Sequence, residues 1–190
     1  MEQLRTFIAI ELTREIQDVL KTTQEALRKS GGDVKWVKPE NIHLTLKFLG
    51  ELTENKIDLV KAAMRKSLIG FKNFSFQLDV VGAFPKIENP KIIWVGISTG
   101  KLEIGQLVTT LGNNLESLGV EKEERDFAPH ITIGRLRSSV NRFALTQMIK
   151  NHLLPPHLEQ KAGQVILFKS TLTSQGPIYE AIEKFALIKD

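Results

Sequence analysis

The amino-acid sequence predicts an α+β fold of two similar lobes, each a mostly antiparallel sheet with two helices on one side. Strands and helices are interspersed along the 190 residues, yet several strands are joined by short turns rather than by helices. The connection from Ala83 to Pro90 is one example, and short connections of this kind favour antiparallel pairing. A second observation, a repeat at a fixed offset, indicates the two lobes.

The first half of the chain predicts two strand–helix pairs with a short edge strand between them. The run RTFIAIEL at residues 5–12 is short, apolar and rich in β-branched and aromatic residues, as expected of a buried strand. Thr13 is placed to cap a helix that extends to about Lys29, where two glycines end it. The next elements are an edge strand at 35–37, a strand at 41–49, a helix at 53–68 and a strand at 74–84.

The second half predicts the same kinds of element in a similar order. Leucines at helical spacing indicate a helix over residues 107–118, which Gly119 ends. The remaining elements are strands at 92–97 and 129–136, a helix at 142–150, and strands at 164–172 and 178–187.

One offset of 87 residues, the separation of His43 and His130, aligns the two halves. It places FIAIE at 7–11 on WVGIS at 94–98, and it also superposes a later helix and strand of each half. A regular α+β chain will match itself at some offset by chance. That explanation does not account for the superposition of two His-x-Thr pairs by the same offset, so we expect a duplication.

Length and composition set the broad class. The chain fits a single domain, residues 1–190, built of two closely joined lobes. It has no cysteine, and therefore no disulfide, thiolate metal site or cysteine nucleophile; its net charge of +4 weakly favours an anionic partner. No apolar run approaches the roughly 20 residues of a membrane span, and MEQLRTFIAIEL does not read as a signal peptide. We therefore expect a cytoplasmic protein.

The segments NIHLTLKFLG at 41–50 and APHITIGRL at 128–136 carry the candidate chemistry. Strict alternation along the first strand puts His43, Thr45 and Lys47 on one face and Leu44, Leu46 and Phe48 on the other, core-facing side. His130 and Thr132 share a face of the second strand in the same way, whereas alternation puts Arg135 on the opposite face unless a bulge turns it.

Two histidines and two threonines that face each other would suit a phosphodiester. An imidazole titrates near neutral pH, so one ring can accept a proton from the entering oxygen while the other supplies one to the leaving oxygen. Threonine hydroxyls can donate hydrogen bonds to the non-bridging oxygens without adding charge. No metal or other cofactor is needed for this chemistry. The alternatives are structural histidines, a two-histidine metal site that lacks an evident third ligand, and an RNA-end binding module without catalysis.

The sequence resembles the two-histidine phosphoesterases, and within them the RNA 2′,3′-cyclic phosphodiesterases long called 2′-5′ RNA ligases. The resemblance covers nearly the whole chain and rests on WVKPENIHLTLKFLGE, VGAFP, IIWVGI, FAPHITIGRL and LFKSTLTSQGPIYE, which occur in the family's order. It implies a bilobal fold with pseudo-twofold symmetry and the active site in a cleft between the lobes. It also implies hydrolysis of terminal 2′,3′-cyclic phosphate on RNA to a 2′-phosphate, with reversible 2′-5′ ligation to a 5′-hydroxyl end as a secondary activity. Nothing in the sequence demands more than a monomer.

By this resemblance His43 is the proton donor, His130 the proton acceptor, and Thr45 and Thr132 bind phosphate. Arg135 is a further candidate phosphate ligand, because a bulge or its place at the strand end would turn it toward the phosphate. Substrates would be RNA ends such as tRNA fragments, or small cyclic nucleotides. The sequence departs from the family at Ala128, where a basic residue is common, and at Gly134, where alanine is common. Neither is expected to touch the histidines or threonines. Candidates for contacting the rest of the RNA are Trp36, Phe84, Arg125 and Tyr179.

Overall fold

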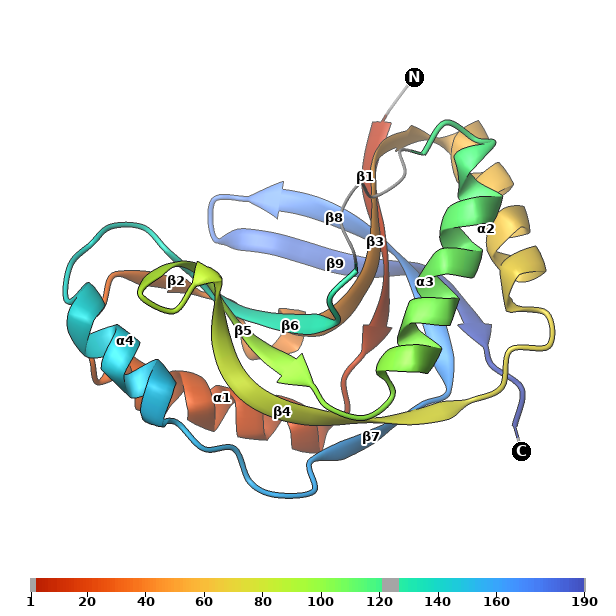
Figure 1. Cartoon of the computed structure of the whole chain (residues 1–190). Helices are drawn as coiled ribbons and strands as arrows, with labels where there is room; N and C mark the ends of the chain where they lie inside the picture. Colours follow the sequence, from red (N-terminus) through yellow and green to blue (C-terminus); the bar gives the residue numbers. More distant parts are fainter. Residues whose placement is uncertain (1–2, 121–126, 190) are drawn as a thin grey trace.

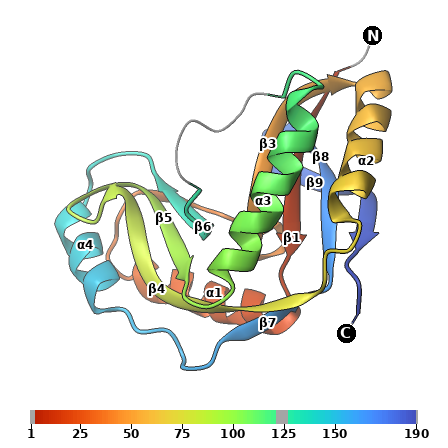
Figure 2. The same ribbon diagram turned by 45° about the vertical axis from the view of Figure 1, so that its right-hand side comes forward.

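The computed structural model describes residues 3–120 and 127–189 and contains two antiparallel sheets and four helices (Figure 1). The first sheet has the strand order β3-β1-β8-β9, with bounds β1 Gln3–Glu11, β3 His43–Thr53, β8 Gln164–Thr173 and β9 Gly176–Ala186. Helices α2 (Glu54–Leu68) and α3 (Lys101–Glu116) run beside this sheet, as Figure 2 shows. The predicted α+β class is confirmed.

The second sheet has the strand order β2-β6-β5-β4-β7, and helices α1 (Arg14–Arg28) and α4 (Arg142–Asn151) pack on it. Its strands are β2 Val34–Trp36, β4 Phe74–Lys86, β5 Asn89–Ile97, β6 His130–Leu136 and β7 Glu159–Ala162. The Thr13 side chain accepts a hydrogen bond from the Ile16 N–H at 3.5 Å, so it caps α1 as predicted. A single 3₁₀ turn, η1 (Pro39–Asn41), leads into β3.

The two halves of the chain are exchanged between the sheets. A shift of 87 residues carries β1, α1, β3, α2 and β4 onto β5, α3, β6, α4 and β8. The spatial order β3-β1-β8 therefore matches β6-β5-β4, with the last strand of each half placed in the other half's sheet. Each helix that follows a first strand also packs on the opposite sheet, α1 on the second and α3 on the first. The duplication predicted from the offset is confirmed as two interlocked lobes.

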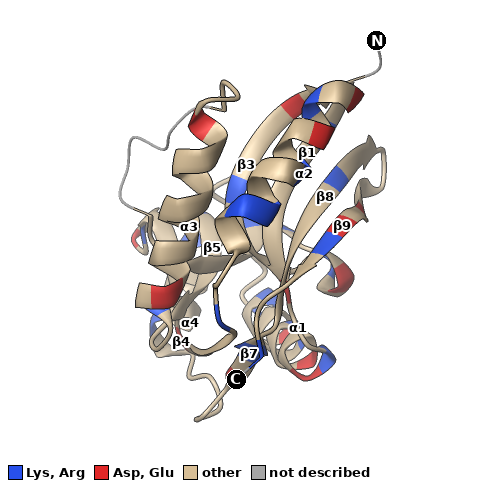
Figure 3. Cartoon of the chain, turned by 90° about the vertical axis from the view of Figure 1, so that its right-hand side faces the viewer, with Lys and Arg blue, Asp and Glu red and all other residues tan. Residues whose placement is uncertain are grey.

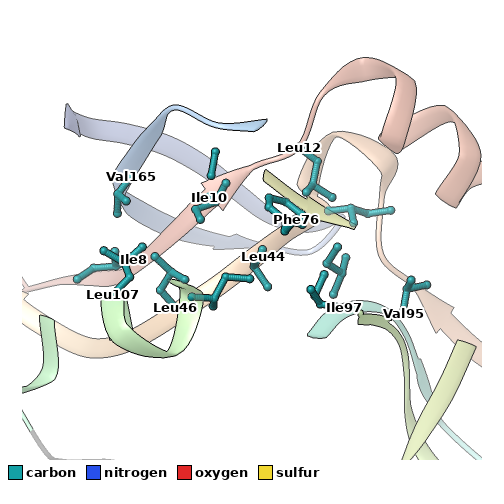
Figure 4. Packing of buried hydrophobic residues seen from close by; sticks show 14 of the residues in the cluster. Ile8, Ile10, Leu12, Leu44, Leu46, Phe76, Val95, Ile97, Leu107 and Val165 are labelled. Carbon is teal, nitrogen blue, oxygen red and sulfur yellow. The ribbon is translucent and has the colours of Figure 1, made fainter. Parts of the chain in front are cut away.

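One continuous hydrophobic core joins the two lobes (Figure 4). Ile8 and Leu46 of the first sheet pack with Leu107 of α3 on the face that carries the helices. Phe76 and Ile97 of the second sheet belong to the same buried cluster. Because helices and core occupy one face of the first sheet, its other face is left for polar and aromatic side chains.

Most predicted elements lie within a few residues of the observed bounds. Strand β7 is not predicted, because EQKA is short and one of its two buried side chains is the polar Gln160. None of the helices in residues 3–120 and 127–189 has the length and apolar character needed to span a lipid bilayer.

Candidate active site

His43 is the first residue of β3 and lies half-buried in an aromatic cluster on the face opposite the core. Its Nδ1 is 2.8 Å from the Asn41 carbonyl oxygen. A carbonyl oxygen can only accept, so Nδ1 carries a hydrogen and Nε2 is the atom left to exchange protons with a ligand. Phe7 stacks on the imidazole with ring centroids 4.8 Å apart, and Tyr179 packs edge-on at 5.3 Å. Burial lowers the pKa of His43, and the hydrogen bond to Asn41 only partly opposes this effect.

His130 is held in the same way at the start of β6. Its Nδ1 is 2.8 Å from the Ala128 carbonyl oxygen, which again leaves Nε2 for a ligand. Phe84 packs edge-on against the ring at 5.0 Å, and Trp94 lies at 6.4 Å. Trp94 is 87 residues after Phe7, so equivalent strands supply a ring to each histidine. The expectation that Ala128 does not touch a histidine is wrong for its main chain.

A β-bulge at the same point of β3 and β6 changes which side chains follow the two motifs. Along β6, Thr132 pairs with Trp94 and Gly134 with Ile93, so Ile133 is an extra residue. Along β3, Thr45 pairs with Ala9 and Lys47 with Ile8, so Leu46 is an extra residue. Each bulge reverses the alternation that follows it. Residues 48 and 135 consequently share the face of the histidine and threonine of their strand.

The bulges correct two predictions from strict alternation. Phe48 was expected to face the core, but its side chain is 58% exposed and lines the cavity beside His43. Lys47 was expected to share the His43 face, but it pairs with the core residue Ile8 and is buried. On β6, the bulge brings Arg135 to the cavity. This is the change of face that the sequence required before Arg135 could contact a phosphate.

The second bulge is tied down by a buried glutamine from α1. Gln24 donates hydrogen bonds from Nε2 to the carbonyl oxygens of Val37, at 2.7 Å, and Ile133, at 2.8 Å. Ile133 is the extra residue of the bulge, and its carbonyl also accepts from the Val37 N–H at 3.0 Å. Gln24 is 1% exposed, so these bonds lie away from competing water. Helix α1 thus fixes the strand geometry that orients Arg135.

A cavity of about 760 Å³ lies between the lobes and collects most of the predicted site. His43, Thr45, Thr132 and Arg135 line it, together with Tyr179. His130 is not among the lining residues, but it shares the cavity-facing side of β6 with Thr132 two residues away. The structure therefore brings both threonines, Arg135 and His43 around one space, with His130 at its margin.

The charges around this cavity are of one sign. Six basic residues line it, and none of the described lining residues is acidic. They are Arg5, Arg28, Lys35, Lys38, Arg135 and Arg137. None of these six forms an ion pair within the part of the chain that the structure describes. Elsewhere both signs are interspersed, as along α2 and β9 in Figure 3. The cavity is thus suited to an anionic ligand.

Arg5 is a cavity residue that the sequence interpretation missed. It precedes Phe7 by two positions on β1 and lines the cavity with it. Burial raises the pKa of the Tyr179 hydroxyl, and the positive charges of Arg5 and Arg135 oppose that rise. Both guanidinium groups therefore lie near the same phenol. Arg5 and Phe7 are two residues apart and therefore share one face of the strand, which could have indicated a basic group on that face. The short apolar run, however, predicted only a buried strand.

The other candidates for RNA contact fall in different places. Trp36 and Tyr179 line the cavity. Phe84 packs against His130 and is not among the residues that line the cavity. Arg125 lies outside the described residues. At Gly134, a Cβ would lie 2.8 Å from Val34 Cγ1 and 3.0 Å from Trp36 Cε3, so a side chain there would displace these two side chains of β2.

Comparison with known proteins decides the family. The model of the family described as "LigT like Phosphoesterase" matches residues 10–94 and again residues 95–179. The chain belongs to the LigT-like phosphoesterase family. The two successive matches each contain one His-x-Thr strand, as the interlocked lobes require.

Relatives of this LigT-like phosphoesterase match it over almost their full length. A Thermotoga maritima protein named RNA 2′,3′-cyclic phosphodiesterase is 36% identical over 180 residues, covering 94% of this chain and 93% of that protein. A protein of the same name from Methanothermobacter thermautotrophicus is 31% identical over 185 residues, covering 97% of this chain and 100% of that protein.

Solved structures share the fold of the LigT-like phosphoesterase. The protein TT0787 of Thermus thermophilus has a TM-score of 0.80 at 26% identity, covering 97% of this chain and 98% of that chain. E. coli LigT in its apo form has a TM-score of 0.79 at 22% identity, covering 98% and 99%. The second likeness concerns the fold alone.

Proposed function

We propose that this LigT-like phosphoesterase hydrolyses terminal 2′,3′-cyclic phosphate on RNA and leaves a 2′-phosphate. The observation that carries the proposal is the matched pair of imidazoles, each held through Nδ1 by a carbonyl two residues earlier, beside a cavity whose charged lining residues are all basic. The activity that names the Thermotoga and Methanothermobacter relatives supports it.

The reaction follows from the two free Nε2 atoms. His130 Nε2 takes a proton from water as the water oxygen bonds to phosphorus. The bond from phosphorus to the ribose O3′ breaks, and His43 Nε2–H gives its proton to that leaving oxygen. The products are a 2′-phosphate and a 3′-hydroxyl, with His43 neutral and His130 charged. Proton exchange with solvent restores the starting state.

Thr45, Thr132 and Arg135 hold the phosphate during this exchange. The hydroxyl groups donate to non-bridging oxygens, and the guanidinium group offsets the negative charge that grows on them in the transition state. An Arg fork can donate two parallel hydrogen bonds to a phosphate, which fixes its orientation as well as its charge. Support comes from the cavity, which these three residues line from both motif strands.

The proton on His43 is coupled to substrate binding. In the free protein burial lowers the pKa of His43, so the ring is neutral at neutral pH. A donor must be protonated, and a phosphate anion beside the ring favours the charged imidazolium. Binding of the cyclic phosphate therefore charges the residue that will protonate its leaving group.

The same site can also accept a nucleophile other than water, in a second reaction that is reversible. When a 5′-hydroxyl replaces water, its attack on the cyclic phosphate expels O3′ and creates a 2′-5′ linkage. Suitable substrates are RNA ends such as tRNA fragments, and small cyclic nucleotides with the same phosphodiester. We also propose that residues 1–190 act as one domain and as a cytoplasmic monomer. The exchange of strands between the lobes supports the single domain, and a cavity formed within one chain supports the monomer.

The product distinguishes this proposal from other ways of opening the ring. The protein is incubated with a short RNA ending in 2′,3′-cyclic phosphate in the presence of EDTA, and the monoester is identified by phosphorus NMR. We expect the 2′-phosphate as the sole product. A 3′-phosphate, or a loss of activity in EDTA, would contradict the assignment of O3′ as leaving group without a metal.

A further inference from the structure

The cavity extends well beyond the two motif strands. One arm of it reaches the edge strand β2 and the end of α1. We call this the β2 arm and define it by five lining residues: Arg28, Lys35, Trp36, Lys38 and Arg137. None of them has a part in the reaction proposed above. The β2 arm therefore needs a role of its own.

Basic side chains continue from the end of β6 into the β2 arm. Thr132, Arg135 and Arg137 all line the cavity. Arg135 is the penultimate residue of β6, and Arg137 directly follows Leu136, the last residue of that strand. Lys35 is the cross-strand partner of Arg135 and also lines the cavity. This arrangement suits a ligand that carries phosphates at regular intervals rather than at one end.

Aromatic surfaces lie beside these charges. The Arg28 guanidinium carbon is 5.5 Å from the centroid of the Trp36 ring, and both side chains face the cavity. Phe48, at the β3 wall, is 58% exposed. Proteins bind single-stranded RNA by stacking unpaired bases on aromatic rings and Arg planes while basic side chains follow the backbone. The β2 arm contains both kinds of group and, among its described residues, no acidic one.

We propose that the β2 arm binds the single-stranded RNA that leads into the cyclic phosphate. The protein then discriminates an oligonucleotide end from a cyclic mononucleotide, with Arg137 and Lys35 on upstream phosphates and Trp36 on an upstream base. This inference rests on the proposed function, because the terminal phosphate must occupy the Thr45 and Thr132 site for the strand to enter the arm.

Binding and turnover are measured separately, so that the two proposals can fail independently. Binding uses a single-stranded tetranucleotide ending in 2′-phosphate and the matching nucleoside 2′-phosphate, each titrated calorimetrically at several salt concentrations. We expect the tetranucleotide to bind at least about tenfold more tightly. The slope of log K against log salt should also be steeper, by about 0.7 for each additional phosphate contact on single-stranded nucleic acid.

The variants Arg137→Ala and Lys35→Ala identify the residues responsible. Each should reduce tetranucleotide affinity and flatten its salt slope while the mononucleotide affinity changes less than twofold. Lys21→Ala removes the same charge from an exposed position of α1 outside the cavity and serves as the matched control. Equal affinity for both ligands in the wild-type protein would overturn the proposal that the β2 arm binds RNA. Equal losses of tetranucleotide affinity in Arg137→Ala and Lys21→Ala would also overturn it. Absence of turnover on cyclic-phosphate RNA would instead overturn the proposed function.

Discussion

Gln24 offers a sharp test of whether the β6 bulge orients the phosphate site. Replacing it with leucine keeps a similar side-chain volume but removes both donors, at 2.7 and 2.8 Å, from the carbonyls of Val37 and Ile133. Each buried hydrogen bond contributes about 1 kcal/mol net, so the free energy of unfolding should fall by about 2 kcal/mol. For a chain of this length that corresponds to a melting temperature lower by roughly 4–8 °C.

The functional effect should be of similar size and separate from the loss of stability. If the bulge relaxes, Arg135 loses its orientation, and a charge-assisted hydrogen bond to phosphate is worth about 1.5–3 kcal/mol. We therefore expect kcat/KM on cyclic-phosphate RNA to fall roughly 10- to 100-fold, which is the same free energy expressed as a rate ratio. The assay is run well below the melting temperature of the variant, so that unfolding does not contribute.

Gln160 is the matched control, because it makes an equivalent pair of buried hydrogen bonds but does not line the cavity and bonds only to residues outside β6. Its Oε1 accepts from the Thr13 N–H and its Nε2 donates to the Glu11 carbonyl, both at 2.8 Å, and it is 5% exposed. Gln160→Leu should lower the melting temperature by a similar amount and leave kcat/KM within about twofold. Equal kcat/KM in the two variants would refute the reasoning that Gln24 acts through the bulge.

Three further predictions concern the phosphate site and its surroundings. Arg135→Ala should raise KM for cyclic-phosphate RNA about 10- to 100-fold. Arg135→Lys should raise KM less, because lysine keeps the charge but not the forked pair of donors. An unchanged KM in Arg135→Ala would exclude a contact between Arg135 and the phosphate. The His43 pKa, followed by NMR, should lie below about 6.5 in the free protein and rise when inorganic phosphate binds; a pKa at or above 6.5 without ligand would contradict the burial of the ring. Gly82→Ala should lower both the melting temperature and kcat, because a Cβ there would lie 2.3 Å from Trp94 Cη2 and displace the indole, whose ring centroid is 6.4 Å from that of His130. A wild-type melting temperature would show that the indole has room to move.

The sequence predicted the four motif residues because their arrangement is local. Alternation over three consecutive residues is enough to put His43 with Thr45, and His130 with Thr132, on one face of a strand. The fixed offset between the pairs then related them without any knowledge of how the lobes pack. The same offset predicted the duplicated strands and helices, and most of their bounds differ by only a few residues from those observed.

The remaining features depend on contacts between distant segments. The bulges that reverse Lys47, Phe48 and Arg135 arise from pairing with β1 and β5, and one is held by Gln24 of α1. The exchange of β4 and β8 between the sheets likewise has no local signature. Arg5 and the β2 arm enter the cavity only when the strands from different parts of the chain are assembled.

The most direct test of two-histidine catalysis is the turnover of His43→Ala and His130→Ala on RNA ending in 2′,3′-cyclic phosphate. A positioned acid or base contributes about 10²- to 10⁴-fold, so each variant should lose at least about a hundredfold in kcat while melting cooperatively as a folded protein. Wild-type turnover in either folded variant would contradict the account.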